Sequence, residues 1–294
     1  MAKSGRRPCG DHLRNCLGVA RRATKVLIQT SLSGVQAIAT QLDPSGARRL
    51  GCSEAEWRAR QELAACYRVF DLLGWSESIY NHISVRVPGA DDAFLINPFG
   101  LLYSEVCASN LVKIDTDGNT LDGSAYLVNK AGFTQHAHFH RNLDWAHAIC
   151  HVHTTATMAV CSTEAGLLPI NFYACGFIGR IGYHEFEGVT VREEEGARLL
   201  ADLGDKRVLM LRNHGPVVLG GTLGEMFFQM WALQRACEIQ LATLSMGQPV
   251  PVADEVIRVH QRDLSQVMLP GGPGAADLAA WTRKVDRIDR SWRD

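Results

Sequence analysis

Apolar residues recur at helical spacing in the first well-patterned part of the chain and at strand-like spacing after it. Between 57 and 73 they return every three or four positions, which predicts an amphipathic helix that ends before Gly74. Residues 53–56 read Ser-Glu-Ala-Glu, the spacing of a capping box at the start of such a helix. The folded part of the chain is therefore expected to begin near Ser53.

Shorter apolar runs follow, and turn-forming residues separate several of them. They predict strands over 79–87, 93–97, 113–115, 146–153, 208–211 and 217–219. Longer helical patterns predict two further helices, over 133–143 and 222–246. Strands joined by short turns and flanked by helices indicate an α/β layered domain with a mixed or largely antiparallel sheet.

Charge divides the chain into parts of different character. Residues 1–50 contain nine Lys and Arg but two Asp, although the formal net charge of all 294 residues is −1. We predict that 1–50 is a basic, poorly ordered N-terminal extension; a nucleic-acid-binding arm and a mitochondrial-type presequence are the alternatives. The globular domain is predicted over 51–250, and the segment 251–294, interrupted by Pro and Gly, as a C-terminal tail.

Composition argues against several classes of protein. Hydrophobic residues make up 46% of the chain and charged residues 21%, which is enough apolar material for a buried core. No run of about 18 apolar residues is present to span a bilayer, and no secretory signal precedes the domain. Near-zero net charge gives no case for nucleic acid or a membrane surface as a partner. Nine scattered Cys without a Cys-x-x-Cys motif indicate reduced thiols in a cytoplasmic protein.

Histidines carry the candidate chemistry. His151 and His153 stand two residues apart on a predicted strand, so both rings point to the same face and can bind one ion. Thr154 and Thr155 follow and can orient the rings by hydrogen bonds. His214 lies in a tight turn before a glycine, which leaves room for close backbone approach and makes it a natural third ligand. Three His with open coordination positions are typical of a catalytic divalent metal site.

Other polar residues have less specific spacing. His136 and His140 are four residues apart on a predicted helix, a spacing that can bind metal but more often reflects packing or surface exposure. Asn81 opens a predicted strand, and residues 97–100 form a turn after another. Both can offer amide donors to an anionic substrate, although turn chemistry alone explains them.

Five segments, taken in order, resemble the class II aldolase/adducin family. They are Asn81–Arg86, Leu95–Tyr103, His151–Thr154, Gly182–Gly188 and Leu211–Gly215. The resemblance implies a three-layer αβα domain with a central mixed, mostly antiparallel sheet. It also implies a Zn²⁺-type site at His151, His153 and His214, and a tetramer with sites at subunit interfaces. Positions that grip a substrate phosphate in the sugar aldolases of the family correspond to Asn81, Phe99, Gly100, Lys130 and Ala131.

One position departs from the sugar aldolases. These enzymes carry an acidic residue near the start of the helix before the His-x-His strand, whereas Gly132 stands here. Ala-Gly-Phe at this place resembles the adducin-type bacterial branch. The nearest titratable residues, Lys130 and His136, are therefore the predicted catalytic residues, and Lys130 favours an anionic substrate. We expect the protein not to be an efficient sugar-phosphate aldolase.

These features predict a metal-dependent lyase that acts on a small hydroxy- or oxo-acid. Aldol cleavage or decarboxylation would proceed through a metal-stabilised enediolate. One divalent metal is expected, with Zn favoured and Fe, Mn or Co compatible with three neutral imidazoles. An Fe(II)-dependent oxygenase using the same histidines and a non-catalytic adducin-like scaffold are the alternatives. A homotetramer is expected from the family and from an apolar helix face, Met226, Phe227, Met230 and Trp231, although ordinary core packing explains that face equally well.

Overall fold

A seven-stranded mixed sheet forms the centre of the protein. The computed structural model describes residues 45–90, 92–267 and 271–294, so most of the predicted basic extension lies outside the described residues. The strands follow the spatial order β3-β2-β1-β4-β7-β6-β5. Their bounds are β1 His82–Arg86, β2 Ala93–Ile96, β3 Val112–Asp115, β4 Ala148–His151, β5 Ile181–His184, β6 Val208–Leu211 and β7 Gly215–Gly220.

Register brings the ends of four central strands to one edge of the sheet. All neighbouring strands pair antiparallel except β5 and β6, which are parallel. His82, the first residue of β1, pairs with His151, the last residue of β4, and His151 also pairs with Val217 of β7. Leu211 at the end of β6 pairs with Gly215 at the start of β7. Side chains from separate parts of the chain therefore meet at this edge.

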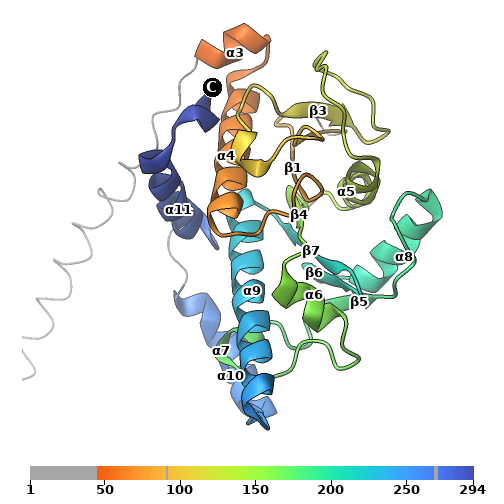
Figure 1. Ribbon diagram of the computed structural model, residues 1–294, viewed down its shortest axis with the longest axis vertical. Coiled ribbons are helices and arrows are strands. Elements are labelled where there is room, and N and C mark those ends of the chain that lie inside the picture. The colour runs from red at the N-terminus through yellow and green to blue at the C-terminus, as the bar shows by residue number, and fades with distance from the viewer. Residues whose placement is uncertain (1–44, 91, 268–270) are drawn as a thin grey trace, which may run out of the picture. The chain divides into compact units, whose positions relative to one another are not determined.

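Helices cover both faces of the sheet, as the three-layer αβα prediction requires. In Figure 1, α4 and α9 lie on one side of the strands and α5 and α8 on the other. Helix α11 packs against both α4 and α9. The main helices are α4 Glu54–Leu72, α5 Lys130–Asn142, α6 Thr155–Cys161, α7 Phe172–Cys175, α8 Glu193–Leu203, α9 Leu223–Met246, α10 Asp254–Asp263 and α11 Ala275–Ile288, with a short α3 at Ser45–Leu50.

Alternation along the strands divides the core between the two faces. Ile83 and Val85 of β1 join the larger apolar cluster, which also contains the buried residues of α4 and α9. Ile149 of β4 joins the cluster formed with Phe139 of α5 and Leu199 of α8. Residues 82 and 84 of β1 and 151 of β4 therefore face the α5 side. None of the helices in the described ranges is long and apolar enough to cross a membrane.

Ser53 caps α4, as expected, but the capping box is incomplete. The Ser53 hydroxyl accepts a hydrogen bond from the Glu56 amide at 3.0 Å. The Glu56 carboxylate does not return to the Ser53 amide; it binds Arg60 at 3.0 Å and Lys113 at 2.9 Å. Glu56 is buried, and tertiary ion pairs have taken the place of the local bond.

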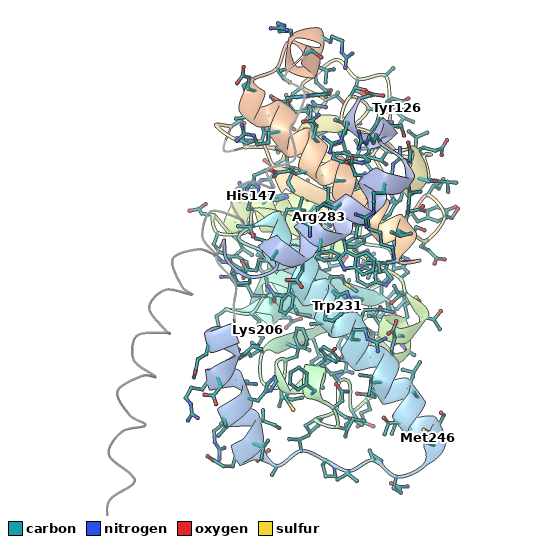
Figure 2. All side chains as sticks on the ribbon, turned by 90° about the vertical axis from the view of Figure 1, so that its left-hand side faces the viewer. Tyr126, His147, Lys206, Trp231, Met246 and Arg283 are labelled. Carbon is teal, nitrogen blue, oxygen red and sulfur yellow. The ribbon has the colours of Figure 1, made fainter. Side chains whose placement is uncertain are left out.

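The apolar face of α9 belongs for the most part to the core of the chain, the alternative to a subunit interface, so it gives little support to the expected homotetramer. Met226, Phe227 and Met230 are fully buried in the core of the single chain. Trp231 alone of the four is partly buried, and Figure 2 shows it midway along α9. The helix packs over β7 and β4, so its apolar residues are already covered.

The last part of the chain is helical where it is described. Helix α11 packs on α4 and α9, and the side chain of Trp292, which follows it, is 1% exposed. The predicted division into an extension, a domain and a tail stays a prediction. The structure places much of 275–294 against the domain.

Candidate metal centre

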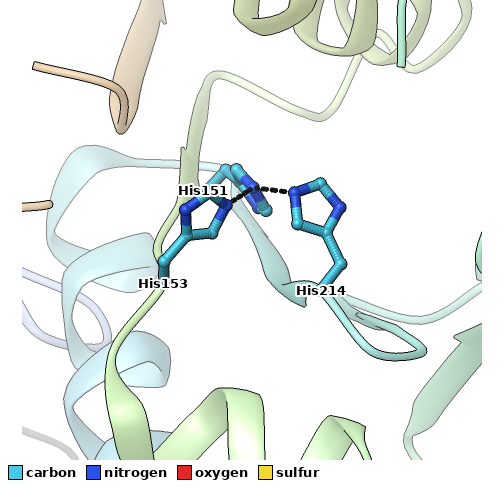
Figure 3. Close-up of side chains that lie close together, drawn as sticks. All are labelled: His151, His153 and His214. Carbon is cyan, nitrogen blue, oxygen red and sulfur yellow. Dashed lines mark hydrogen bonds between the residues drawn. The ribbon is translucent and has the colours of Figure 1, made fainter. Parts of the chain in front are cut away.

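Three histidines meet at the edge of the sheet where β4 and β6 end and β7 begins. His151 closes β4, His153 follows two residues later, and His214 lies in the turn between β6 and β7. Figure 3 shows the three rings turned toward one another. Strand alternation continues one step beyond β4, because Val152 is buried in the core of the opposite face. The predicted same-face geometry of His151 and His153 is therefore present.

Close backbone approach holds the His214 turn against the His-x-His segment. A Cβ atom at Gly215 would lie 2.3 Å from the carbonyl oxygen of Val152, so no larger residue fits. This agrees with the expected reason for a glycine after the turn histidine. Asn213 adopts φ of 56°, a left-handed conformation that asparagine tolerates better than most residues.

The ring nitrogens are close enough to share one ion. The Nε2 atom of His151 lies 2.8 Å from Nε2 of His153 and 3.3 Å from Nε2 of His214. One ligand nitrogen from each ring falls within 4.8 Å of the others. Tetrahedral Zn²⁺ with bonds of 2.0–2.1 Å separates its ligand nitrogens by about 3.4 Å. The pair His151–His214 has this separation, and the pair His151–His153 is somewhat closer.

The protonation chemistry of the cluster also fits a cation. Nδ1 of His151 lies 3.0 Å from the Pro216 carbonyl, which can only accept, so Nδ1 carries the proton. Burial, followed by the neighbouring His214 and His153 rings, lowers the pKa of His151 well below its usual range. Burial likewise lowers the pKa of His153, and that of His214 to about 4. His151 therefore presents an unprotonated Nε2, and neutral rings can direct lone pairs at one point.

His82 occupies the space beside Gly132, where sugar aldolases carry their acid. A Cβ atom on Gly132 would lie 2.4 Å from Cδ2 of His82 and 2.9 Å from its Nε2. The His82 ring stacks on His151, with centroids 5.2 Å apart and an interplanar angle of 29°. No side chain at position 132 fits while His82 holds this position. Sequence reasoning missed His82; its one signal was its place on the same strand face as Ser84.

A chain of buried polar groups runs from His82 into the domain. Nδ1 of His82 lies 2.9 Å from Nε2 of His136, and Nδ1 of His136 lies 2.7 Å from the Ser84 hydroxyl. That hydroxyl is 2.8 Å from Nε2 of His140, whose Nδ1 is 3.2 Å from the Ala146 carbonyl. His136 and His140 are thus packed and hydrogen-bonded, in agreement with the packing interpretation of their spacing.

The two predicted catalytic residues lie in different surroundings. His136 is fully buried, and its Nε2 is engaged by Nδ1 of His82 at 2.9 Å. Lys130 is exposed at the first position of α5. It lines a cavity of about 520 Å³ with Asp117 and Arg141, which none of the three clustered histidines lines.

The predicted substrate-binding residues come from loops that lie side by side. The Phe99 amide donates to the Leu127 carbonyl at 2.8 Å, and the Tyr80 and Phe99 rings are 6.4 Å apart. Asn129, which caps α5 next to Lys130 and Ala131, donates to the Tyr80 carbonyl at 3.4 Å. The structure therefore joins the loops of Asn81, Phe99–Gly100 and Lys130–Ala131.

In the loops that carry the predicted substrate-binding residues, a buried oxygen of Asn81 makes no hydrogen bond to the described residues. Asn81 is 1% exposed, and its Oδ1 has no hydrogen-bond partner among the described residues. Gly100 has φ of 101° and open space around its Cα.

Thr154 does not orient the histidine rings as expected. Its hydroxyl lies 2.6 Å from Oε1 of Gln234 and caps α6 by accepting from the Thr157 amide. The Pro216 carbonyl orients His151 instead.

Two further cavities differ in their distance from the clustered histidines. A polar one of about 340 Å³ adjoins the centre and is lined by His153, Glu77, Gln234 and Glu238, among others. A more apolar one of about 760 Å³ is lined by Trp231 and Lys206 (Figure 2) and by none of the clustered histidines. The first is the space open to a ligand held at His153.

Comparisons with known proteins show what this chain is similar to. The family model described as Class II Aldolase and Adducin N-terminal domain matches residues 61–241. A Caulobacter vibrioides protein, provisionally named an aldolase class 2 protein, is 40% identical over 247 residues, covering 82% of this chain and 94% of its own length. Alpha-adducin of Rattus norvegicus is 46% identical over 211 residues, which is 70% of this chain but 29% of adducin. The crystal structure of an aldolase II superfamily protein from Pseudomonas syringae is 40% identical, with a TM-score of 0.80, and covers 84% of this chain and all of that one.

Proposed function

The chain belongs to the class II aldolase and adducin family, and from that premise we propose that it is a metal-dependent carbon–carbon lyase. Its substrate is a small anionic hydroxy- or oxo-acid, and the reaction is aldol cleavage or decarboxylation. The observation that carries the proposal is the convergence of His151, His153 and His214 as neutral rings within 4.8 Å. A packed structural site has no need of three such lone pairs.

One divalent ion, with Zn²⁺ favoured, would be held by these three rings. When bound, the ion acts as a Lewis acid toward the oxygens of the substrate. The Pro216 carbonyl fixes the orientation of His151, and the His214 turn is held by its contact at Gly215. The polar cavity beside His153 adjoins the centre, but it is lined by Glu77 and Glu238 and by none of Asn81, Phe99 and Lys130, so the anionic part of the substrate would lie outside it.

The lack of an acidic side chain at position 132 favours a substrate other than a sugar phosphate. A positioned general acid or base contributes about 10²- to 10⁴-fold to such reactions, and Gly132 has neither a side chain nor space for one. Lys130 and the amide-bearing loops around Asn81 and Phe99 are the groups proposed to bind the anionic part of the substrate. Decarboxylation does not need the absent acid, so it suits this site as well as aldol cleavage does.

A non-catalytic scaffold is the second candidate, because alpha-adducin is 46% identical over 211 residues. An Fe(II)-dependent oxygenase is the third, since neutral imidazoles also bind iron. Metal content separates the three. We expect protein purified without added metal to contain about one Zn or Mn per chain; iron favours the oxygenase, and no metal favours the scaffold.

The activity test is a substrate panel on the metal-loaded protein. Phosphorylated ketoses are compared with small 2-oxo, 2-hydroxy and aromatic hydroxy acids, and both aldehyde and CO₂ are measured. We expect turnover of an acid, and we expect it to be lost in His151→Ala but kept in His138→Ala, a histidine on α5 outside the cluster. Turnover of ribulose or fuculose phosphate at about 10 s⁻¹ contradicts the argument from Gly132.

A homotetramer is proposed from the family, and exposed apolar side chains near the site support an interface there. Phe186 is 54% exposed, and its ring is 6.2 Å from that of His214. Leu127, bonded to Phe99 through its carbonyl, is 75% exposed. Large exposed apolar groups of this kind are typical of contact surfaces. A cytoplasmic location stays a prediction; the cysteines in the described ranges are all free thiols.

A further inference from the structure

We propose that His82 binds the substrate through an unprotonated Nε2, which accepts a hydrogen bond from the substrate's hydroxyl group beside the three-histidine centre. His136, Ser84 and His140 are positioning residues, because their hydrogen bonds determine which nitrogen of His82 carries the proton. The inference rests on the proposed function, because it takes the ligand of the centre to be a hydroxy acid. His82 is then the polar group that lies beside Gly132, the position at which the sugar aldolases of the family carry an acidic residue.

The position of His82 follows from two contacts. Its ring stacks on His151 and fills the space next to Gly132, so it lies where a side chain from position 132 would otherwise reach the centre. Nδ1 is engaged by His136 at 2.9 Å. Among the described residues, the hydrogen bond of the His82 ring is made through Nδ1, which leaves Nε2 as the ring atom available to a ligand.

The donor-to-acceptor direction of this series of hydrogen bonds is set at its inner end, at Ala146. The Ala146 carbonyl can only accept, so Nδ1 of His140 donates to it. Burial and the nearby Arg86 lower the pKa of His140 to about 3, so this ring is neutral and its Nε2 is an acceptor. The Ser84 hydroxyl must therefore donate its one proton to His140.

The remaining bonds then have a single direction. The Ser84 oxygen has no second proton, so Nδ1 of His136 donates to it at 2.7 Å. His136 is fully buried and neutral, which makes its Nε2 an acceptor for the N–H at Nδ1 of His82. A neutral His82 with its proton on Nδ1 has a lone pair on Nε2. The inner carbonyl thus determines which group His82 offers to the site.

This lone pair favours a ligand that donates a hydrogen bond. A 2-hydroxy acid has a hydroxyl proton to give, whereas the matching 2-oxo acid has an acceptor at the same place. One neutral hydrogen bond is worth about 0.5–1.5 kcal/mol, so we expect about a 2- to 13-fold preference for the hydroxy acid.

The polarity is tested by ¹⁵N NMR of protein labelled in its histidine rings, first without metal and then loaded with zinc. We expect His82 to show a protonated Nδ1 and an unprotonated Nε2 that is not bound to the metal. Ser84→Ala interrupts the series of hydrogen bonds between His136 and His140 with a small change in side-chain volume. It should make the His82 signals change toward the opposite tautomer. His138→Gln on the same helix should leave them unchanged. A proton on Nε2 of His82 in the wild type, or a metal bond to it, overturns the proposal.

The ligand is tested by measuring the affinity of the zinc-loaded protein for L-lactate and for pyruvate. We expect lactate to bind more tightly to the wild type, and the preference to disappear in His82→Val while the zinc content stays at one per chain. A preference that survives this substitution, or none in the wild type, overturns the role of His82 toward the ligand. The NMR result needs no turnover, so failure of the lyase assignment is distinguishable from failure of this inference.

Discussion

At the scale of single residues, the candidate centre depends on rings that keep their lone pairs free of protons. His151 shows how this is done, because its Nδ1 proton is committed to the Pro216 carbonyl and its Nε2 lies near two further ring nitrogens. With its proton on Nδ1, His151 accepts at Nε2 a hydrogen bond from Nε2 of His153 at 2.8 Å, and a change of tautomer at His153 gives the cluster a second lone pair. Such a cluster is stabilised when a cation binds it.

We predict that His214→Ala loses metal affinity by at least about 100-fold, because it removes one of three ligands. Competition with a chelator, followed by metal analysis, measures the change. His138→Ala is the control and should keep wild-type affinity, since His138 lies on α5 away from the cluster. Equal metal content in both variants would remove His214 from the ligand set.

A second prediction concerns Gly132 and His82. Gly132→Ala should lower the free energy of unfolding by about 1–2 kcal/mol, because the new methyl group would lie 2.4 Å from Cδ2 of His82. In a His82→Ala background the same change should be neutral or stabilise by up to about 1 kcal/mol, because alanine is the better helix former. Urea unfolding of the four proteins completes the cycle. The same effect in both backgrounds would show that the two positions do not touch.

The third residue-scale prediction is a pH dependence from His140. The unfolded ring takes up a proton near pH 6.5, but the folded ring, buried beside Arg86 and near His147, has a pKa of about 3. Stability from the neutral ring is therefore complete above pH 6.5 and is lost as the pH falls from 6.5 toward 3. Below pH 6 the wild type should lose about 1 kcal/mol per pH unit more than His140→Gln does. Urea unfolding at pH 6 and pH 5 measures this difference, and parallel losses would contradict it.

At the scale of elements, a buried ion-pair network joins α4 to the strand β3 and the segment after it. Arg60 donates to Glu56 at 3.0 Å, to the Leu111 carbonyl at 2.7 Å and to Asp122 at 2.8 Å. Its side chain is 1% exposed. Lys113 of β3 completes the network on Glu56.

We predict that Arg60→Leu destabilises the protein by about 3–5 kcal/mol, because it leaves the buried Glu56 carboxylate without one of its two cationic partners. Arg58→Leu is the matched control, two residues away on the exposed face of the same helix, and should change stability by less than about 0.5 kcal/mol. Thermal or urea unfolding measures both. Similar small effects would show that apolar packing alone holds α4.

At the scale of the whole molecule, the edge of the sheet brings distant segments to one place. The strands that meet there are β1, β4, β6 and β7. The residues at their ends, from His82 to Gly215, span more than 130 positions of the sequence. Phe186 and Leu127 leave exposed apolar surface around this edge. A second copy of the chain that covered this surface would also close the site.

We therefore predict that the full chain sediments as an oligomer at micromolar concentration, with a mass of about four times 32.3 kDa. Phe186→Asp should weaken the assembly while leaving the monomer folded, since this side chain is exposed in the single chain. Sedimentation velocity with circular dichroism measures both effects. A 32.3 kDa species in the wild type would contradict the prediction.

Local features of the fold could be predicted because they depend on neighbours in the sequence. Helix α9 has an observed range, Leu223–Met246, close to its predicted one, and β6 and β7 flank the His214 turn as expected. His151 and His153 share a face because side chains alternate along an extended chain. The patterns did not predict strand β5 or helices α3, α6, α7, α8, α10 and α11. Strand β5 is short, and its stabilising neighbour β6 lies farther along the chain.

By itself the sequence determined the period of the elements predicted above, the His-x-His pair, the glycine after His214 and the absence of an acid at position 132. Only the tertiary structure decided what covers each face. The apolar residues of α9 belong to the chain's own core, since periodicity shows that a face is buried but not by what. His82 fills the space at Gly132, 50 residues away along the chain, and takes its polarity from the Ala146 carbonyl through three other side chains. Such contacts exist only when sheet register and helix packing place separate segments together, because hydrogen bonds and steric exclusion act over a few ångströms of space rather than along the sequence.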